Sequence, residues 1–184
     1  MQSLMNFVAF QICWFANILG AAEGYPLLGI LCTSFWLTLH FLFSSRTPSA
    51  EFKLILFAGI SGYLADSLLV VYELLAFPVQ AQFGGPSTVW MVCLWMGFAA
   101  TLSHSLAWLR RKYLLAVVLG AVAGPLSYWA GSKLGAVALP DLQTSLPVVA
   151  LLWAVMMPSL LVALNFFERG RQVDDGLSAQ RNPL

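Results

Sequence analysis

The chain has 184 residues, of which 60% are hydrophobic and only 9% are charged, and its formal net charge is +1. Soluble domains carry roughly 25% charged residues, so this composition argues against a water-soluble globular protein. No basic face with interleaved aromatic residues is present, which argues against nucleic-acid binding. Together with its long apolar runs, the composition predicts a polytopic membrane protein.

Six apolar segments are long enough to cross a bilayer, and they lie near residues 4–22, 25–44, 54–76, 88–108, 114–136 and 146–167. At ~1.5 Å per residue, about 20 residues cross a ~30 Å hydrocarbon core. Lipid cannot satisfy free backbone groups, so an open spanning segment has to be a helix. We therefore expect an all-α protein, a compact bundle of six transmembrane helices. One domain is expected over residues 1–168, followed by a polar cytoplasmic tail over residues 169–184.

The first segment ends in a Gly-Ala-Ala sequence that resembles a signal-peptide cleavage site. However, residues 1–5 contain no Lys or Arg, so the charged region of a signal peptide is missing. Asn6, Gln11 and Asn17 also interrupt the apolar run, which a removable signal segment does not need. We therefore expect this segment to be retained.

The basic residues predict the orientation of the bundle. In a six-helix topology, eight of the nine Lys and Arg residues fall on one side of the membrane: Arg46, Lys53, Arg110, Arg111, Lys112, Arg169, Arg171 and Arg181. Only Lys133 lies near the other side. The positive-inside rule then places both termini in the cytoplasm.

The third segment carries Asp66 near its middle. A carboxyl group in hydrocarbon is costly, so it normally faces other helices or a wet cavity. Counting ~1.5 Å per residue places Asp66 roughly 18 Å from the cytoplasmic side, at a depth similar to that of Asn17, Ser127 and Tyr128. Two interpretations stay open. Asp66 binds a proton, a cation or a polar substrate group, or a protonated Asp66 bonds to Asn17 or Ser127 and fixes helix packing.

Glu73 follows Asp66 by seven residues and would share its helix face. It lies near the outer interface, where charge is inexpensive. We expect a solvated acid there, with Lys133 as the candidate ion-pair partner.

A second polar group gathers within about 10 Å of the cytoplasmic side by the same counting, and it consists of Asn6, His40, His104 and Asn165. On one helix, His104 would share a face with Trp108 and Arg111 and point to the basic rim. A neutral histidine there transfers a proton, or it holds an anionic headgroup together with Arg110 and Arg111, and His40 can join it. The alternative is a histidine that only snorkels to the interface.

The spacing of the histidines and cysteines along the sequence does not indicate a metal site. Neither histidine has a partner at a spacing such as HExxH or HxxxH. Cys13, Cys32 and Cys93 lie inside apolar runs without a CxxC pair, so we expect buried thiols that act as small hydrophobes. We therefore assign no metal ligand and no cofactor from the sequence.

Three stretches carry a resemblance to a known family: NFVAFQICWFANILGA, LADSLL and LWMGFAATLSHSLAWL. They resemble a family of small bacterial inner-membrane proteins catalogued as domain of unknown function 2878. The resemblance extends through Phe167, and the matching residues are Asn6, Gln11, Trp14, Asp66, His104 and Trp108. It carries over no catalytic residue. It implies a multi-pass protein of the bacterial inner membrane. Genes of this family often lie near genes for cyclopropane-type fatty-acid modification, which implies a role around membrane lipid.

Our leading hypothesis is an accessory protein or enzyme of membrane-lipid modification whose partner is membrane lipid. The candidate catalytic residues are His104, Asp66 and His40. The candidate binding residues are Asn6, Gln11, Asn17, Arg110 and Arg111, and the two arginines would attract phosphate. A second hypothesis is a small proton-coupled transporter that uses Asp66. A third is a structural subunit of a membrane complex, working as a homo-oligomer or with a membrane-protein partner.

Overall fold

The computed structural model describes residues 2–181, with side chains described over residues 2–170. The helices are α1 (Gln2–Ala22), α2 (Pro26–Leu39), the π-helix η1 (His40–Ser44), α3 (Pro48–Val71), the 3₁₀ turn η2 (Val79–Ala81), α4 (Val89–Leu102), the 3₁₀ turn η3 (Ala107–Leu109), α5 (Tyr113–Lys133) and α6 (Leu142–Arg181). Residues 2–181 contain no β-strand, so the predicted all-α class and the six main helices are confirmed. Five of these helices are long and apolar enough to cross a membrane, whereas α4 is shorter.

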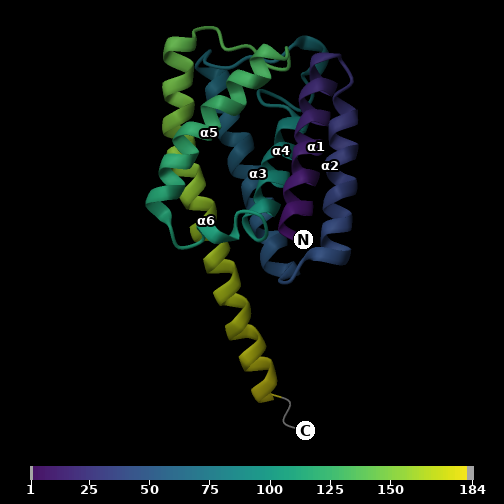
Figure 1. Cartoon of the computed structure of the whole chain (residues 1–184), viewed down its shortest axis with the longest axis vertical. Helices are drawn as coiled ribbons and strands as arrows, with labels where there is room; N and C mark the ends of the chain where they lie inside the picture. Colours follow the sequence, from purple (N-terminus) through teal and green to yellow (C-terminus); the bar gives the residue numbers. More distant parts are fainter. Residues whose placement is uncertain (1, 182–184) are drawn as a thin grey trace.

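The six helices form three neighbouring hairpins (Figure 1). The α3–α4 hairpin lies in the middle, where α4 packs on α1 and α2 and α3 packs on α6. The α1–α2 pair flanks it on one side and the α5–α6 pair on the other (Figure 1). The start of α1 lies at the end of the bundle from which the last part of α6 extends (Figure 1).

The bundle exposes large apolar side chains and buries several polar ones within a mainly apolar core. Large hydrophobic residues are exposed along its outer face, among them Phe35 and Leu151. By contrast, Asn17 and Asp66 are completely buried. A soluble domain rarely exposes large apolar side chains along a whole face, so this surface is compatible with surrounding lipid.

The third helix starts and ends earlier than the sequence predicted. Pro48 occupies the first turn of α3, a position that suits proline because its missing N–H has no helical partner there. The helix ends at Val71, and Glu73 follows in the left-handed region with a φ of 56°. Glu73 therefore does not share a helix face with Asp66, and that prediction was wrong.

The expected contact between Glu73 and Lys133 is also absent. Both side chains are exposed, and the described residues show no ion pair between them. Instead, the Lys133 ammonium lies 5.8 Å from the centroid of the Trp129 ring. The segments after α3 and α5 meet through their backbones, because Ala76 and Ala138 exchange two hydrogen bonds of 2.9 and 2.8 Å.

The fourth helix is shorter than the predicted segment 88–108. Its 14 residues span roughly 21 Å at ~1.5 Å per residue. At its end, the Asn6 amide nitrogen donates to the Ala100 carbonyl at 3.3 Å, and the Asn6 Oδ1 accepts from the Ser105 hydroxyl at 2.8 Å. This side chain replaces helical hydrogen bonds and stabilises a turn after Leu102. His104 and Trp108 therefore do not lie on one continuous helix face, contrary to the prediction.

The sixth helix is longer than predicted at both ends. It begins after Asp141, whose carboxylate accepts hydrogen bonds from the Thr144 hydroxyl and the Gln143 N–H, and these bonds lower the pKa of Asp141. The helix continues to Arg181, past the expected end near residue 167. Residues 182–184 of the expected tail lie outside the described residues.

Candidate functional site

A buried histidine–glutamate pair lies at the end of the bundle that holds the chain termini. His40 opens the π-helix η1, and Glu51 lies in the first turn of α3. The His40 Nε2 is 2.7 Å from the Glu51 Oε2, and the two residues are only 2% and 1% exposed. Short π-helical segments are rare and frequently occur at functional sites. Here the wider turn places a titratable side chain beside an acid from the next helix.

The second carboxylate oxygen of Glu51 binds the turn that precedes α3. Its Oε1 accepts hydrogen bonds from the backbone N–H groups of Arg46 and Thr47 at 3.3 and 3.4 Å. The Thr47 hydroxyl lies 3.4 Å from the same oxygen. A negative charge at a helix N-terminus is also favoured by the helix dipole. The carboxylate of Glu51 therefore has a fixed orientation, with Oε2 directed to His40.

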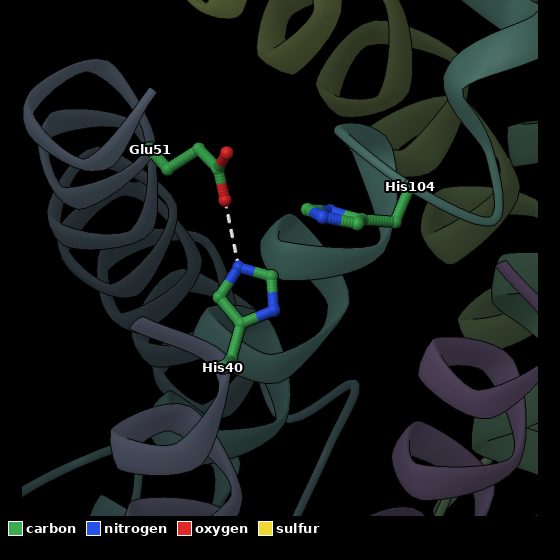
Figure 2. Close-up of side chains that lie close together, drawn as sticks. All are labelled: His40, Glu51 and His104. Carbon is green, nitrogen blue, oxygen red and sulfur yellow. Dashed lines mark hydrogen bonds and ion pairs between the residues drawn. The ribbon is translucent and has the colours of Figure 1, made fainter. Parts of the chain in front are cut away.

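His104 joins this pair from the turn after α4 (Figure 2). Its ring centroid lies 4.8 Å from that of His40, with the planes at 74°. The His104 Nε2 is 3.0 Å from the Ser44 carbonyl oxygen, and a carbonyl can only accept, so Nε2 carries the hydrogen. The neutral ring then has its lone pair on Nδ1, which is buried without a hydrogen-bond partner.

We call His40, Glu51 and His104 the His–Glu–His cluster. Each side chain offers one potential ligand atom, and these atoms lie within 4.8 Å of one another. The sequence predicted that the histidines would meet near the cytoplasmic side but missed Glu51. A usable signal was present, because Glu51 is the one acidic residue between the second and third apolar segments.

Asp66 links three helices in the middle of the bundle. It is completely buried, and its Oδ2 accepts a 2.8 Å hydrogen bond from the Trp95 indole on α4. Its Oδ1 accepts a hydrogen bond from the Tyr128 hydroxyl on α5. These partners differ from the two expected from depth, Asn17 and Ser127. Counting residues for depth cannot determine which way a side chain points around its helix. Both expected partners instead form hydrogen bonds with other residues.

Asn17 holds α1 against α2. Its amide nitrogen donates to the Thr33 hydroxyl and to the Cys13 carbonyl, both at 2.8 Å. The Ser127 hydroxyl accepts from the Trp14 indole at 3.1 Å, which connects α1 to α5. Asn17 is thus a packing residue in this structure, away from the His–Glu–His cluster.

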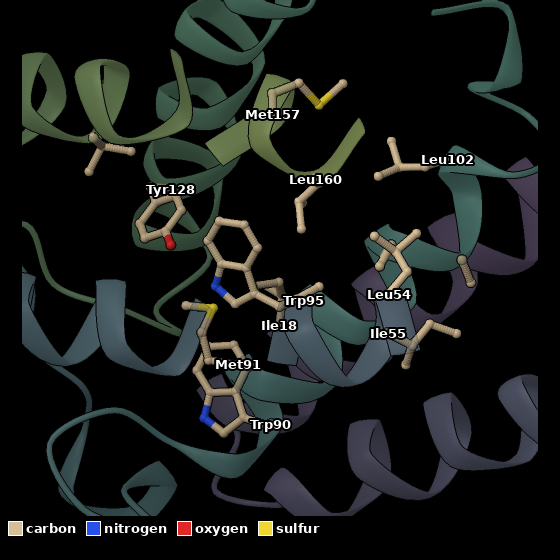
Figure 3. Packing of buried hydrophobic residues seen from close by; sticks show 14 of the residues in the cluster. Ile18, Leu54, Ile55, Trp90, Met91, Trp95, Leu102, Tyr128, Met157 and Leu160 are labelled. Atoms are coloured by element: carbon tan, nitrogen blue, oxygen red, sulfur yellow. The ribbon is translucent and has the colours of Figure 1, made fainter. Parts of the chain in front are cut away.

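A groove of about 620 Å³ lies between α1 and α5. Helices α4 and α6 form its floor, and its walls are mainly aromatic and aliphatic: Phe10, Gln11, Trp14, Met91, Leu94, Trp95, Phe98, Leu106, Trp108, Leu119, Gly120, Ala123, Gly124, Leu126, Ser127, Tyr128, Trp153 and Met157. Trp95 and Tyr128, which line it, lie close together in the core (Figure 3), and both donate a hydrogen bond to Asp66. Gln11 is therefore the predicted binding residue that lines this groove.

The two arginines predicted to bind phosphate differ in their surroundings. The Arg110 guanidinium donates from both terminal nitrogens to the Glu168 carboxylate, each at 2.8 Å. Arg111 is exposed. Asn165 donates to the Arg110 carbonyl at 3.4 Å and so supports this corner. The ion pair leaves Arg111 more accessible to a ligand than Arg110.

A family model described as "Protein of unknown function (DUF2878)" matches residues 3–159. Comparisons with curated proteins and with solved structures find no match.

Proposed function

The chain belongs to the DUF2878 family, and we propose that it is an integral protein of the bacterial inner membrane that acts in membrane-lipid modification. In this proposal both termini face the cytoplasm, and the groove between α1 and α5 binds the acyl chain of a lipid. The observation that carries the proposal is the groove itself, because it combines an apolar lining with a position between two apolar outer helices.

The size and lining of the groove suit a lipid chain. Its volume of about 620 Å³ is within the range of roughly 300–1,000 Å³ that is typical of small-molecule sites. Leu126 is 56% exposed and also lines the groove, so the groove reaches the outer face of the bundle. An acyl chain can therefore enter sideways from surrounding lipid without crossing a polar barrier.

The mouth of the groove lies next to basic side chains. Trp108 lines the groove and is 52% exposed, and the Lys112 ammonium lies 5.3 Å from the centroid of its ring. Arg111 is exposed beside it in the chain. Basic residues attract the anionic headgroups of membrane lipids. A lipid with its chain in the groove would place its phosphate near Lys112 and Arg111.

The binding part of the proposal is tested by a variant that fills the groove. Ala123 is exposed and lines the groove, so Ala123→Phe adds bulk there without entering the closed core. Val122 is 54% exposed and does not line the groove, so Val122→Phe is the matched control. We expect native mass spectrometry of the purified protein to show bound lipid for the wild type and for Val122→Phe, and much less for Ala123→Phe. Equal lipid occupancy in the two variants would remove the proposed site.

The modification part is tested in cells. Whole-cell fatty-acid profiles of a deletion strain and its parent should differ in stationary phase or under stress. The wild type and Val122→Phe should restore the parental profile, whereas Ala123→Phe should not. Identical profiles of deletion strain and parent under all these conditions would contradict a role in lipid modification, even if lipid binding is observed.

The surroundings of Asp66 give less support to a proton-coupled carrier. Asp66 is completely buried, both of its oxygens accept hydrogen bonds, and it does not line the groove. A carrier needs its ion-binding carboxylate to be reached from both sides of the membrane in turn. We therefore assign Asp66 to holding Trp95 and Tyr128 in place beneath the groove.

A further inference from the structure

We propose that His40, Glu51 and His104 bind one divalent transition-metal ion, with Zn²⁺ and Fe²⁺ as the two candidates. This inference goes beyond the proposed lipid function and does not depend on it. Two histidines and one carboxylate form the ligand set of many catalytic zinc sites and of the non-haem iron facial triad.

The geometry of the cluster is close to that of a metal site and needs only small adjustments on binding. The three ligand atoms lie within 4.8 Å of one another. Zn–N and Zn–O bonds of about 2.0–2.2 Å in a tetrahedral site place ligand atoms roughly 3.3 Å apart. Binding would therefore bring the more distant ligand atoms closer and separate the His40 Nε2 from the Glu51 Oε2, which lie 2.7 Å apart. Small side-chain rotations suffice for this, and the three ligands can move separately because they come from three segments, η1, the start of α3 and the turn after α4.

Two of the three ligands already have the outer contacts that metal ligands usually show. Metal-binding histidines normally donate their other ring N–H to a carbonyl or carboxylate, and ligating carboxylates are themselves hydrogen-bonded. The His104 Nε2 donates to the Ser44 carbonyl at 3.0 Å. The Glu51 Oε1 accepts the N–H groups of Arg46 and Thr47. These contacts leave His104 Nδ1 and Glu51 Oε2 as the ligand atoms.

His104 supplies the observation that a simple structural role does not explain. The residue is 8% exposed, and its Nδ1 has no hydrogen-bond partner. Leaving a buried polar atom without a hydrogen-bond partner is unfavourable for folding. A purely structural His40–Glu51 pair would need no second imidazole directed toward it (Figure 2). The hydroxyls of Ser103, which precedes His104, and of Ser45, which follows the Ser44 that His104 contacts, are also buried without partners.

The charges around the cluster also favour a cation. Glu51 supplies one negative charge, and in the described residues no Lys or Arg side chain forms an ion pair with it. Arg46 contacts Glu51 through its backbone N–H, while its guanidinium donates to Gln2 at 3.1 Å. On binding, the metal ion would lie between the His40 Nε2 and the Glu51 Oε2 in place of the hydrogen bond that joins them.

Three protein ligands leave at least one coordination position free. Structural zinc sites normally have four protein ligands, whereas catalytic sites keep a position for water or substrate. The cluster therefore predicts a metal ion that can bind a water molecule or a substrate oxygen. Zn²⁺ would act as a Lewis acid, and Fe²⁺ would add redox chemistry.

The test uses the full-length protein in detergent, purified with an affinity tag that contains no histidine. Because the chain has only two histidines, both in the cluster, no other imidazole can contribute. After treatment with a chelator, the protein is titrated with Zn²⁺, with Fe²⁺ without oxygen, and with Co²⁺ as a spectroscopic probe. Metal content is measured by plasma mass spectrometry. The variants are Glu51→Gln and His104→Ala.

Two control variants address the other possible ligands. Glu73→Gln removes an exposed acid outside the cluster. A Cys13→Ser/Cys32→Ser double variant removes two thiols whose sulfur atoms lie 3.7 Å apart. Both controls should bind metal as the wild type does. If metal binding disappears in the cysteine variant and persists in Glu51→Gln, the proposed site is wrong.

We expect one ion per chain in the wild type and binding weaker by roughly a hundredfold or more in Glu51→Gln and His104→Ala, since even outer-contact changes cost 10–100-fold. The added metal should raise the melting temperature of the wild type but not of these variants. If His104→Ala fails to fold, the Co²⁺ complex of the wild-type protein is measured instead. Nitrogen hyperfine coupling to the bound Co²⁺ would show imidazole ligands, and its absence would contradict the proposed site. Absence of binding for all three ions, or equal binding in Glu51→Gln, overturns the proposal.

Discussion

The Trp95 indole stacks on the Trp153 indole, with ring centroids 4.4 Å apart and planes inclined by 13°. Each ring also lies against a glycine of a neighbouring helix, Trp95 against Gly62 of α3 and Trp153 against Gly124 of α5. A Cβ atom added at either glycine would lie 2.2 Å from the indole. The stack therefore connects four helices and forms the floor of the groove, and only glycine allows this approach.

This close approach predicts that replacing glycine by alanine has different effects on stability at two positions of α5. Gly124→Ala should destabilise the protein by about 1–3 kcal/mol, because the methyl group has to displace the indole or its helix. At Gly131, also on α5, an added Cβ would meet its nearest neighbour, Ile18, at an ordinary 3.4 Å. Gly131→Ala should be neutral or stabilise by up to ~1 kcal/mol. Thermal unfolding in one detergent measures both, and equal melting temperatures of the two variants would contradict the assignment.

Asp66 and Tyr128 should be energetically coupled. Asp66→Asn leaves only one acceptor oxygen for two donors, and Tyr128→Phe removes one of those donors. Each single change should cost about 1–3 kcal/mol, because a buried polar group loses its partner. In the double variant the second change should cost less, with a coupling of about 0.5–3 kcal/mol. Chemical unfolding of the four proteins gives this number.

The control for this cycle is Glu73→Gln, because Glu73 is an exposed acid outside α3. A surface change of this kind should stay within about 0.5 kcal/mol. If Asp66→Asn changes stability no more than Glu73→Gln does, Asp66 has no structural role beneath the groove. Loss of a measured transport activity with intact stability would favour the carrier hypothesis instead.

Composition and hydropathy were sufficient to predict the fold class, because lipid leaves helices as the only open spanning structure. The boundaries of α3 and α4 were not predictable in the same way. Local polar contacts determine them, as when Asn6 binds the turn at Ser105 from a residue 99 positions away. A hydropathy window contains no information on such a contact. The residues after Leu102 are apolar enough for hydropathy to continue the predicted helix, whereas in the structure α4 ends at Leu102.

The sequence predicted the depth of the candidate site residues along the bundle, but it did not predict the direction in which their side chains point around each helix. Counting residues brought His40 and His104 to one level, and the structure places their rings together. The same counting assigned Asn17 to Asp66, whereas Asn17 points to Thr33 on α2. Pairing depends on helix rotation and packing order, and one sequence does not contain these. Glu51 was missed because the predicted third segment started after it.

The Arg110–Glu168 ion pair should regulate how strongly the basic rim attracts lipid. The two side chains are 30% and 21% exposed, so their ion pair should contribute no more than about 1 kcal/mol to stability. Glu168→Gln frees the Arg110 guanidinium, and we expect tighter binding to vesicles or nanodiscs that contain anionic lipid. Glu23→Gln removes an exposed acid from the loop after α1 and is the control with the same change in charge. Equal increases in both variants would show a general charge effect instead.

The orientation of the bundle can be tested on two exposed loop residues. The six main helices run along the bundle in turn, so that α1 starts and α6 leaves at the same end (Figure 1). Eight of the nine basic residues belong to that side by position in the chain, so the positive-inside rule predicts that it faces the cytoplasm. Arg46, before α3, and Pro140, before α6, are exposed and lie in loops at opposite ends.

In a background without Cys13, Cys32 and Cys93, an impermeant thiol reagent should label Pro140→Cys in intact cells. It should label Arg46→Cys only after the inner membrane is opened. The reverse pattern would place the His–Glu–His cluster and the mouth of the groove on the outer side, and both would then have to be explained without cytoplasmic metal or headgroups of the inner leaflet.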